Sequence, residues 1–186
     1  MQDLAHFFYE MGQLKRVKRS GWWVAGIKDP ESVAEHTLRT AQLGYVLATM
    51  EGADPMKTAT MCLFHDTAEA RINDFHRLGQ RYIEKDSGEH RAFIDQMHRL
   101  PTPAAQELTS LVNEYEERTS PEAIIAKDAD RLECLMQALE YRSQGYKNVE
   151  EWIASNHAAL KTTSARHLAE ACLQTDPGKW WHLPEE

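Results

Sequence analysis

Apolar side chains recur at intervals of three and four residues along most of the chain, which is the spacing that keeps them on one face of an α-helix. Near the N-terminus, the residues that show this spacing are Leu4, Phe7, Phe8, Met11 and Leu14. Alternating runs of Val, Ile and Thr, which are typical of half-buried β-strands, are absent. No internal repeat or linker divides the pattern. The sequence therefore predicts an all-α helical bundle that forms a single domain over residues 1–186.

Helix-start signals divide this pattern into elements. Ser32 and Glu35 form a capping box, while Asp54 and Ser120 each precede a proline suited to the first helical turn. Gly21 is predicted to end the first helix. "KDSGEH" (85–90) is a candidate interruption of a later one. The predicted helices cover about residues 2–18, 32–50, 55–70, 80–99, 101–118, 120–141, 149–160 and 163–174.

Composition and charge restrict the class of protein. The 186 residues are 42% hydrophobic, which is enough for one core. The net charge of −8 argues against a surface that coats nucleic acid, although a local positive pocket for a small anion is compatible with it. The three cysteines form no CxxC pair, and "MQDLAHFFYE" is neither a signal peptide nor a membrane span. We therefore expect a soluble, cytoplasmic protein that binds no nucleic-acid polymer and no membrane.

Four residues on the predicted helices are candidates for metal binding: His36, His65, Asp66 and Asp130. Taken singly, three have an ordinary explanation, because core histidines are usually hydrogen bonded and Asp130 has Lys and Arg neighbours for a salt bridge. Asp66 is harder to explain, because an aspartate beside a core face is costly unless it is paired or binds a cation. Together, two imidazoles and two carboxylates suit Mn, Fe, Co, Zn or Mg. His65 and Asp66 would point about 100° apart on a helix and would therefore flank an ion. The set predicts a metal site that leaves positions for water and substrate.

Three motifs extend this pattern: "PESVAEH" (30–36), "FHDTAEA" (64–70) and "KDADRLE" (127–133). They resemble the HD-domain metal-dependent phosphohydrolases, in the small branch that includes the 5′-deoxynucleotidases. The resemblance covers roughly residues 4–145, and the C-terminal helices follow in 146–186. It implies an HD-domain helical fold, one divalent cation and a homodimer. It also implies hydrolysis of a phosphate monoester, such as a deoxyribonucleoside 5′-monophosphate, to nucleoside and phosphate.

The resemblance assigns roles to four further residues. Glu69, one turn beyond His65 and Asp66, matches a catalytic glutamate, and the chemistry needs a proton acceptor or donor there. Asp74 matches a second acidic residue that cooperates with it, although "NDFHR" departs from the family's Gly-Asp-aliphatic-Pro pattern. Arg19 and Trp22 match a phosphate-contacting arginine and a tryptophan that packs beside the nucleotide. The ordinary explanation of this basic stretch is a last helical turn that complements the helix dipole.

Two other functions stay open at this point. Two-metal HD proteins, either phosphodiesterases or oxygenases, have additional histidines in the interval that here holds His76, His90 and His98. The charged surroundings of these three favour surface histidines instead. A non-catalytic nucleotide sensor that keeps the metal site is the other alternative, although the two intact catalytic carboxylates favour an enzyme.

The remaining tryptophans are interpreted as structural. Trp23 is expected in the core. Trp180 and Trp181, in "KWWHLPEE", are expected to cover an edge of the core or to form a dimer contact, because indole rings bury large apolar areas.

Overall fold

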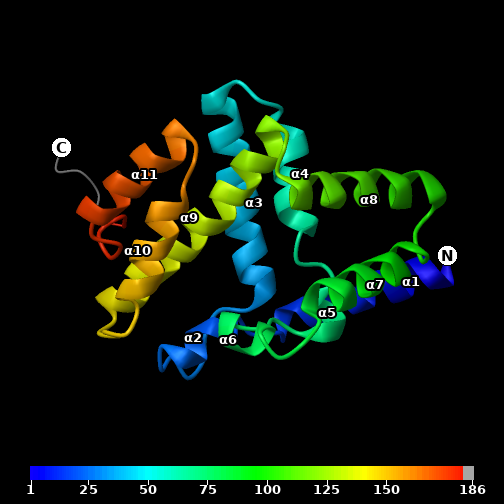
Figure 1. The fold of residues 1–186 in the computed structure, drawn as a ribbon, viewed down its shortest axis with the longest axis horizontal. Coiled ribbons are helices and arrows are strands. Elements are labelled where there is room, and N and C mark those ends of the chain that lie inside the picture. Colours follow the sequence, from blue (N-terminus) through cyan, green and yellow to red (C-terminus); the bar gives the residue numbers. More distant parts are fainter. Residues whose placement is uncertain (182–186) are drawn as a thin grey trace.

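The computed structural model describes residues 1–181 and consists of helices joined by loops and turns, with no strand in this range (Figure 1). The all-α class is therefore confirmed. No helix within the described range combines the length and the apolar character needed to cross a membrane. In chain order the elements are α1 (Gln2–Met11), η1 (Gly12–Lys15), α2 (Gly21–Val24), α3 (Val33–Glu51), α4 (Pro55–Phe64), α5 (Glu69–Ile72), α6 (Arg77–Gln80), α7 (Lys85–Met97), α8 (Thr102–Glu117), α9 (Pro121–Ser143), α10 (Glu150–Ala159) and α11 (Thr163–Gln174).

Three predicted helix starts are confirmed by their capping geometry. The Ser32 hydroxyl accepts from the backbone N–H of Glu35, and the Glu35 carboxylate accepts from the backbone N–H of Ser32, which completes the capping box of α3. The Asp54 carboxylate caps the first turn of α4, and the Ser120 hydroxyl caps that of α9. These signals position the starts of three helices that carry the site.

The first predicted helix is too long. α1 ends at Met11, and η1 adds one further turn. The chain then leaves the helical path because it pairs with the segment that precedes α3, where the N–H of Arg19 donates to the carbonyl of Glu31 at 3.0 Å. Gly21 does not end a helix but begins the short α2.

The helix expected over residues 80–99 is also shorter than predicted. "KDSGEH" does not interrupt a helix, because α7 begins at Lys85 and includes it. The separate α6 is a single turn closed on itself. Nδ1 of His76 accepts from the N–H of Gly79, and the Gln80 side chain donates to the carbonyl of Phe75 at 2.6 Å.

α9 is the central helix, and α3, α4, α8, α10 and α11 pack against it. Its inward side carries small and aliphatic residues such as Ala126, Ala129 and Leu132, all fully buried. α3 and α4 also pack closely, because a Cβ atom at Gly44 would lie 2.6 Å from Sγ of Cys62. This close packing brings α3, the end of α4 and the middle of α9 together.

A buried carboxylate ties the C-terminal helices to this centre. Asp128 on α9 is fully buried, and it accepts from the backbone N–H groups of Lys161 and Thr162 at 2.9 and 2.7 Å, just before α11. The C-terminal helices are therefore held against α9 by hydrogen bonds as well as by apolar contacts.

The three cysteines are free thiols, and Cys62 is the buried one.

The tryptophans differ from expectation. Trp22 is 2% exposed, whereas Trp23, expected in the core, is 54% exposed. Neighbours on a helix point about 100° apart, so the short α2 turns only one of them inward. Trp180 and Trp181 are 86% and 64% exposed and thus cover no core edge, so the alternative of a dimer contact stays a prediction. The rest of that segment, residues 182–186, lies outside the described residues.

Candidate metal centre

The helix expected to run through "FHDTAEA" ends inside this motif, at Phe64. Two side chains donate to carbonyl groups near its end. Nδ1 of His65 donates to the carbonyl of Cys62, and Oγ1 of Thr67 donates to the carbonyl of Phe64, both at 2.7 Å. His65 and Asp66 therefore lie on a turn at the end of α4, not within a helix as predicted.

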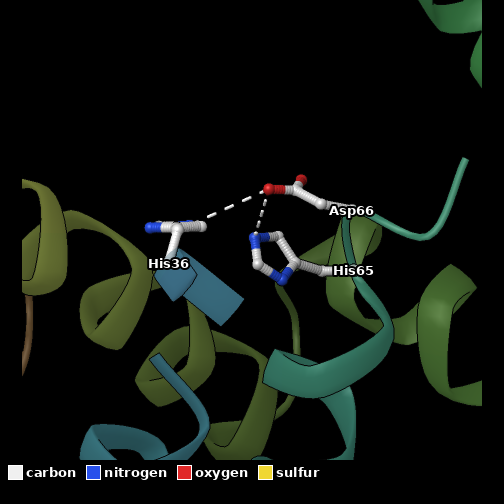
Figure 2. Close-up of side chains that lie close together, drawn as sticks. All are labelled: His36, His65 and Asp66. Carbon is white, nitrogen blue, oxygen red and sulfur yellow. Dashed lines mark ion pairs between the residues drawn. The ribbon is translucent and has the colours of Figure 1, made fainter. Parts of the chain in front are cut away.

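The structure brings the four predicted ligands together where the first turns of α3, the end of α4 and the middle of α9 meet. Nε2 of His65 lies 3.1 Å from Oδ2 of Asp66 and 3.9 Å from Oδ1 of Asp130. Nε2 of His36 lies 3.8 and 3.2 Å from the same two oxygens. Figure 2 shows His36 and His65 beside the Asp66 carboxylate. Metal–ligand bonds of about 2.0–2.2 Å place the ligands of one ion about 3–4 Å apart, so these separations suit a single cation.

Each histidine ring is held at its other nitrogen. Nδ1 of His36 lies 2.5 Å from Oε2 of Glu133, and the second oxygen of Glu133 accepts from Nε and Nη2 of Arg39 at 3.0 and 2.8 Å. Nδ1 of His65 donates to a backbone carbonyl, as described above. A neutral ring with its proton on Nδ1 presents an Nε2 lone pair, so both rings are oriented as metal ligands usually are.

Asp130 is held in a similar way, through one of its two oxygens. Its Oδ2 accepts from Nζ of Lys127 at 2.7 Å and from the hydroxyl of the buried Tyr115 at 3.2 Å, while Oδ1 faces the histidines. Burial raises the pKa of Asp130, but Lys127 and the histidines outweigh this and hold the pKa well below its ordinary value. Asp130 is therefore an anion with one oxygen directed at the centre.

The donor set fits a divalent cation. Nε2 of His36 and Nε2 of His65 are buried and make no hydrogen bond within the described residues, although carboxylate oxygens surround them. Lone pairs that face carboxylates without a proton or a cation between them are unfavourable. The electrostatics agree: although burial and Arg19 lower the pKa of His36, Glu133 and Asp130 raise it to about 10. The site thus favours positive charge at its centre.

Arg19 and Asp74 lie at the edge of this centre. Nη1 of Arg19 is 3.3 Å from Oδ2 of Asp66, and Oδ2 of Asp74 accepts from the backbone N–H of Ser20 at 2.7 Å. Burial lowers the pKa of Arg19, but Asp74, Asp66 and the other acidic groups nearby hold it well above its ordinary value. Arg19 is therefore a cation beside the centre, and Asp74 anchors the backbone next to it.

A cavity of about 500 Å³ opens onto the centre, a size typical of small-molecule sites. It is bordered by Asp66, Asp130, Arg19, Asp74 and Glu69. Glu69 is the first residue of α5 and is 1% exposed. The cavity thus joins all the predicted acidic residues and the predicted phosphate-binding arginine.

Trp22 also borders the cavity, but it has almost no accessible surface. Its ring stacks on that of Trp152 with centroids 5.8 Å apart and meets the edge of Tyr141 at 5.1 Å. Its Nε1 donates to Oε1 of Glu31 at 2.9 Å. The predicted nucleotide-packing tryptophan is therefore mainly a core residue of the cavity wall.

The histidines considered for a second metal lie outside the centre. His90 and His98 are exposed, whereas His76 borders the cavity. None of the three belongs to the groups of potential ligands found among the described residues. The first of these groups is His36, His65 and Asp66, and Asp130 joins it through its distances to both histidines. The second consists of Glu31, His36 and Glu133, but it uses the side of His36 that already binds Glu133.

The sequence interpretation missed three residues that support the ligands: Arg39, Tyr115 and Glu133. A lysine next to Asp130 is expected to form a salt bridge with it, and Lys127 does so. Lys127 and Glu133 lie within "KDADRLE", three residues on either side of Asp130, so helical spacing places them near it. Arg39 stands three residues after His36, but nothing local indicates its partner. Tyr115 carries no signal in the sequence, because only the packing of α8 on α9 brings it to Asp130.

Comparisons with known proteins agree with this geometry. A family model described as "HD domain" matches residues 11–172. The protein 5′-deoxynucleotidase HDDC2 of Dictyostelium discoideum is 34% identical, over 79% of this chain and 82% of its own length, and that of Homo sapiens is 33% identical, over 78% and 72%. A solved structure of a conserved hypothetical protein from Pyrococcus furiosus is 30% identical, with a TM-score of 0.77 over 92% of this chain and 99% of that one. The chain belongs to the HD domain family, in the branch that includes these 5′-deoxynucleotidases.

Proposed function

We propose that this protein is a metal-dependent phosphohydrolase that cleaves a nucleoside 5′-monophosphate, of the deoxyribose or ribose series, to nucleoside and phosphate. One observation carries the proposal: two oriented histidines converge on two carboxylates, and these carboxylates, with Arg19 beside them, border a cavity large enough for a nucleotide. Relatives named 5′-deoxynucleotidase, from slime mould to human, support this substrate class.

One divalent cation, either Mn, Co, Fe, Zn or Mg, would be held by His36, His65, Asp66 and Asp130. When bound, such an ion neutralises phosphate oxygens and lowers the pKa of water. The separations of 3.1–3.9 Å between the histidine nitrogens and the carboxylate oxygens support one ion at this position. Arg39 acts indirectly, because it fixes Glu133, which orients His36, whereas Tyr115 donates directly to Asp130.

Arg19 would bind the phosphate, since its charge is maintained by the acidic groups around it and its Nη1 already lies at the centre. Asp74 would keep Arg19 in place through the Ser20 backbone. Trp22 would form part of the wall beside the nucleoside.

Glu69 would move the proton. Water attacks phosphorus as the bond from phosphorus to the 5′-oxygen breaks, so water loses a proton and the leaving oxygen gains one. Glu69 borders the cavity and follows the Asp66 turn directly, where its N–H donates to the Asp66 carbonyl. We assign the transfer to Glu69, with Asp74 as its acidic neighbour in the cavity.

The test is a phosphate-release screen of nucleotides and other phosphate esters, repeated with Mn, Co, Mg and Zn. We expect turnover of nucleoside 5′-monophosphates that His65→Ala and Asp66→Ala abolish together with metal binding. Full metal occupancy in both variants would refute the ligand set. Oligonucleotides hydrolysed as fast as monophosphates would contradict a small substrate.

The same measurements separate the alternatives. A binuclear phosphodiesterase or oxygenase would hold two ions per chain, so metal analysis of the purified protein decides between one and two. A non-catalytic nucleotide sensor would bind nucleotides but release no phosphate from any of them. The position of Glu69 in the cavity favours the enzyme.

We also propose a cytoplasmic homodimer in which each chain acts as one domain. The exposed side of α3 carries Leu38, Tyr45 and Val46, which are 58%, 46% and 51% exposed and lie near one stripe of the helix. Such a stripe suits a symmetric contact between copies. Light scattering coupled to gel filtration would measure the mass, and Tyr45→Glu is expected to shift it towards that of one chain.

A further inference from the structure

The cavity has two ends of different chemistry, joined by the segment that precedes and begins α2. At one end, Arg19 contacts Asp66 at the candidate centre. Three residues further along, Trp22 stacks on Trp152, which belongs to α10. Both tryptophans border the same cavity. In Figure 1, α10 lies along α9, and α2 lies beyond the ends of both.

Trp152 is an aromatic side chain of this cavity whose ring is partly accessible. Trp22 is almost fully buried, whereas Trp152 is half-buried. Gly21 keeps the indole accessible: a Cβ atom there would lie 3.6 Å from Nε1 of Trp152, so a longer side chain would extend over the ring edge. The α10 end of the cavity therefore has an accessible indole ring.

α9 links the two ends along its length. Asp130 at the centre and Cys134 both border the cavity, and four residues of helix separate them by about 6 Å. Burial raises the pKa of the Cys134 thiol to about 12, so this wall is neutral and weakly polar. Beyond it, α10 contributes Ser155 and Asn156 as polar groups. α10 also contributes the exposed carboxylate of Glu151, so this end combines an indole ring and neutral polar groups with one carboxylate, whereas Arg19 lies at the centre.

A nucleotide has the same polarity, with a dianionic phosphate at one end and a flat aromatic base at the other. We propose that the base lies against Trp152 and that this contact makes the enzyme prefer nucleotides to smaller phosphate esters. The inference rests on the proposed hydrolysis of nucleoside monophosphates. Stacking depends on the face of the base, not on its hydrogen-bonding edge, so purines and pyrimidines both benefit.

The experiment compares dAMP and dCMP with 2-deoxyribose 5-phosphate, which has the same phosphate and sugar but no base. In Trp152→Leu we expect the KM for both nucleotides to rise about 5- to 100-fold. The KM for 2-deoxyribose 5-phosphate should change less than about twofold, and kcat for all three should stay similar. Trp152→Phe should restore most of the nucleotide preference. The matched control is Trp23→Leu, an exposed tryptophan on α2 that does not border the cavity.

The sugar phosphate also tests whether the variant is folded, because a damaged centre would impair all three substrates equally. Equal losses, or no change for the nucleotides, would overturn the role of Trp152. Binding of dAMP and of 2-deoxyribose 5-phosphate to the chelator-treated protein is measured in parallel by calorimetry. If the parent protein hydrolyses none of these esters with any metal, the proposed function fails. Weaker dAMP binding in Trp152→Leu, with sugar-phosphate binding unchanged, would still support the base contact, and unchanged or absent dAMP binding would refute it.

Discussion

The chemistry of individual residues at the centre depends on which nitrogen of each histidine is already engaged. Nδ1 of His36 is bound to a carboxylate, and Nδ1 of His65 to a backbone carbonyl. The two partners differ in charge, because Glu133 is an anion whose pKa is lowered by His36 and Arg39 despite burial, which raises it. A carboxylate makes the imidazole a more basic ligand than a carbonyl does. Metal binding by His36 should therefore depend more strongly on Glu133 than metal binding by His65 depends on its backbone carbonyl.

Glu133→Gln is expected to weaken metal binding about 10- to 100-fold, because the amide keeps the shape of the side chain but removes its charge. The affinity is measured by titrating Mn²⁺ into metal-free protein in a calorimeter. Glu140→Gln is the matched control, since Glu140 also binds Arg39 but does not contact His36. If both variants bind the ion as tightly as the parent, Glu133 serves only packing.

Glu69→Gln is expected to keep the metal and the fold but to lower kcat about 10²- to 10⁴-fold, the usual contribution of a proton-transfer group. KM should change much less, because the interaction belongs to the transition state. Metal content is determined on the same preparation as the kinetics. Glu151→Gln, at an exposed glutamate of the same cavity, is the control. A fully metallated Glu69→Gln within a few-fold of the parent would assign proton transfer to another group.

At the scale of the elements, helix starts could be predicted and several helix ends could not. Ser32 and Ser120 cap their own helices, so the signal and its partner lie within three residues. The first helix is cut short by pairing of Arg19 with Glu31, twelve positions later in the chain. Such pairing depends on tertiary contacts, and the spacing of apolar residues along the chain gives no information about them.

One carboxylate of α1 binds groups on α5 and at the end of α7, beside the apolar contacts of Phe7. Glu10 accepts from Nε of Arg71 at 2.5 Å, from Nε2 of Gln96 at 2.8 Å and from Nη1 of Arg99 at 3.0 Å. Burial raises the pKa of Glu10, but these donors outweigh it, and the pKa is lowered below 4.5. A lowered pKa stabilises the fold above the unfolded-state value, and this stabilisation is lost as the pH falls through the folded-state value.

Glu10→Gln should therefore lower the free energy of unfolding at about pH 7, and the difference from the parent should shrink as the pH drops below about 4.5. Urea unfolding of both proteins over this pH range measures it. Asp3→Asn, which changes an acidic residue in the first turn of α1, is the control. A difference that is independent of pH would mean that the charge of Glu10 does not contribute.

At the scale of the whole molecule, the sequence predicted the residues that carry chemistry better than those that support them. His36, His65, Asp66 and Asp130 belong to short motifs, and the structure brings all four together. Tyr115 comes from a helix without any such motif. The burial of Trp22 in place of Trp23 has the same cause. The ring of Trp22 packs on Trp152 of α10 and Tyr141 of α9, and these contacts depend on tertiary packing.

The four predicted ligands belong to α3, α9 and the end of α4, which pack against one another at the core, so one ion would cross-link the fold. A ligand at about 100 times its dissociation constant stabilises the folded state by about 2.7 kcal/mol. For a chain of this size, that corresponds to a rise in Tm of about 5–10 °C. Circular dichroism melts with excess Mn²⁺ and with EDTA measure it, and Asp130→Ala should lose most of the rise. An equal rise in the Tm of Asp130→Ala would mean that the stabilising ion binds elsewhere. No rise in the Tm of the parent at saturating metal would mean that no ion cross-links these helices.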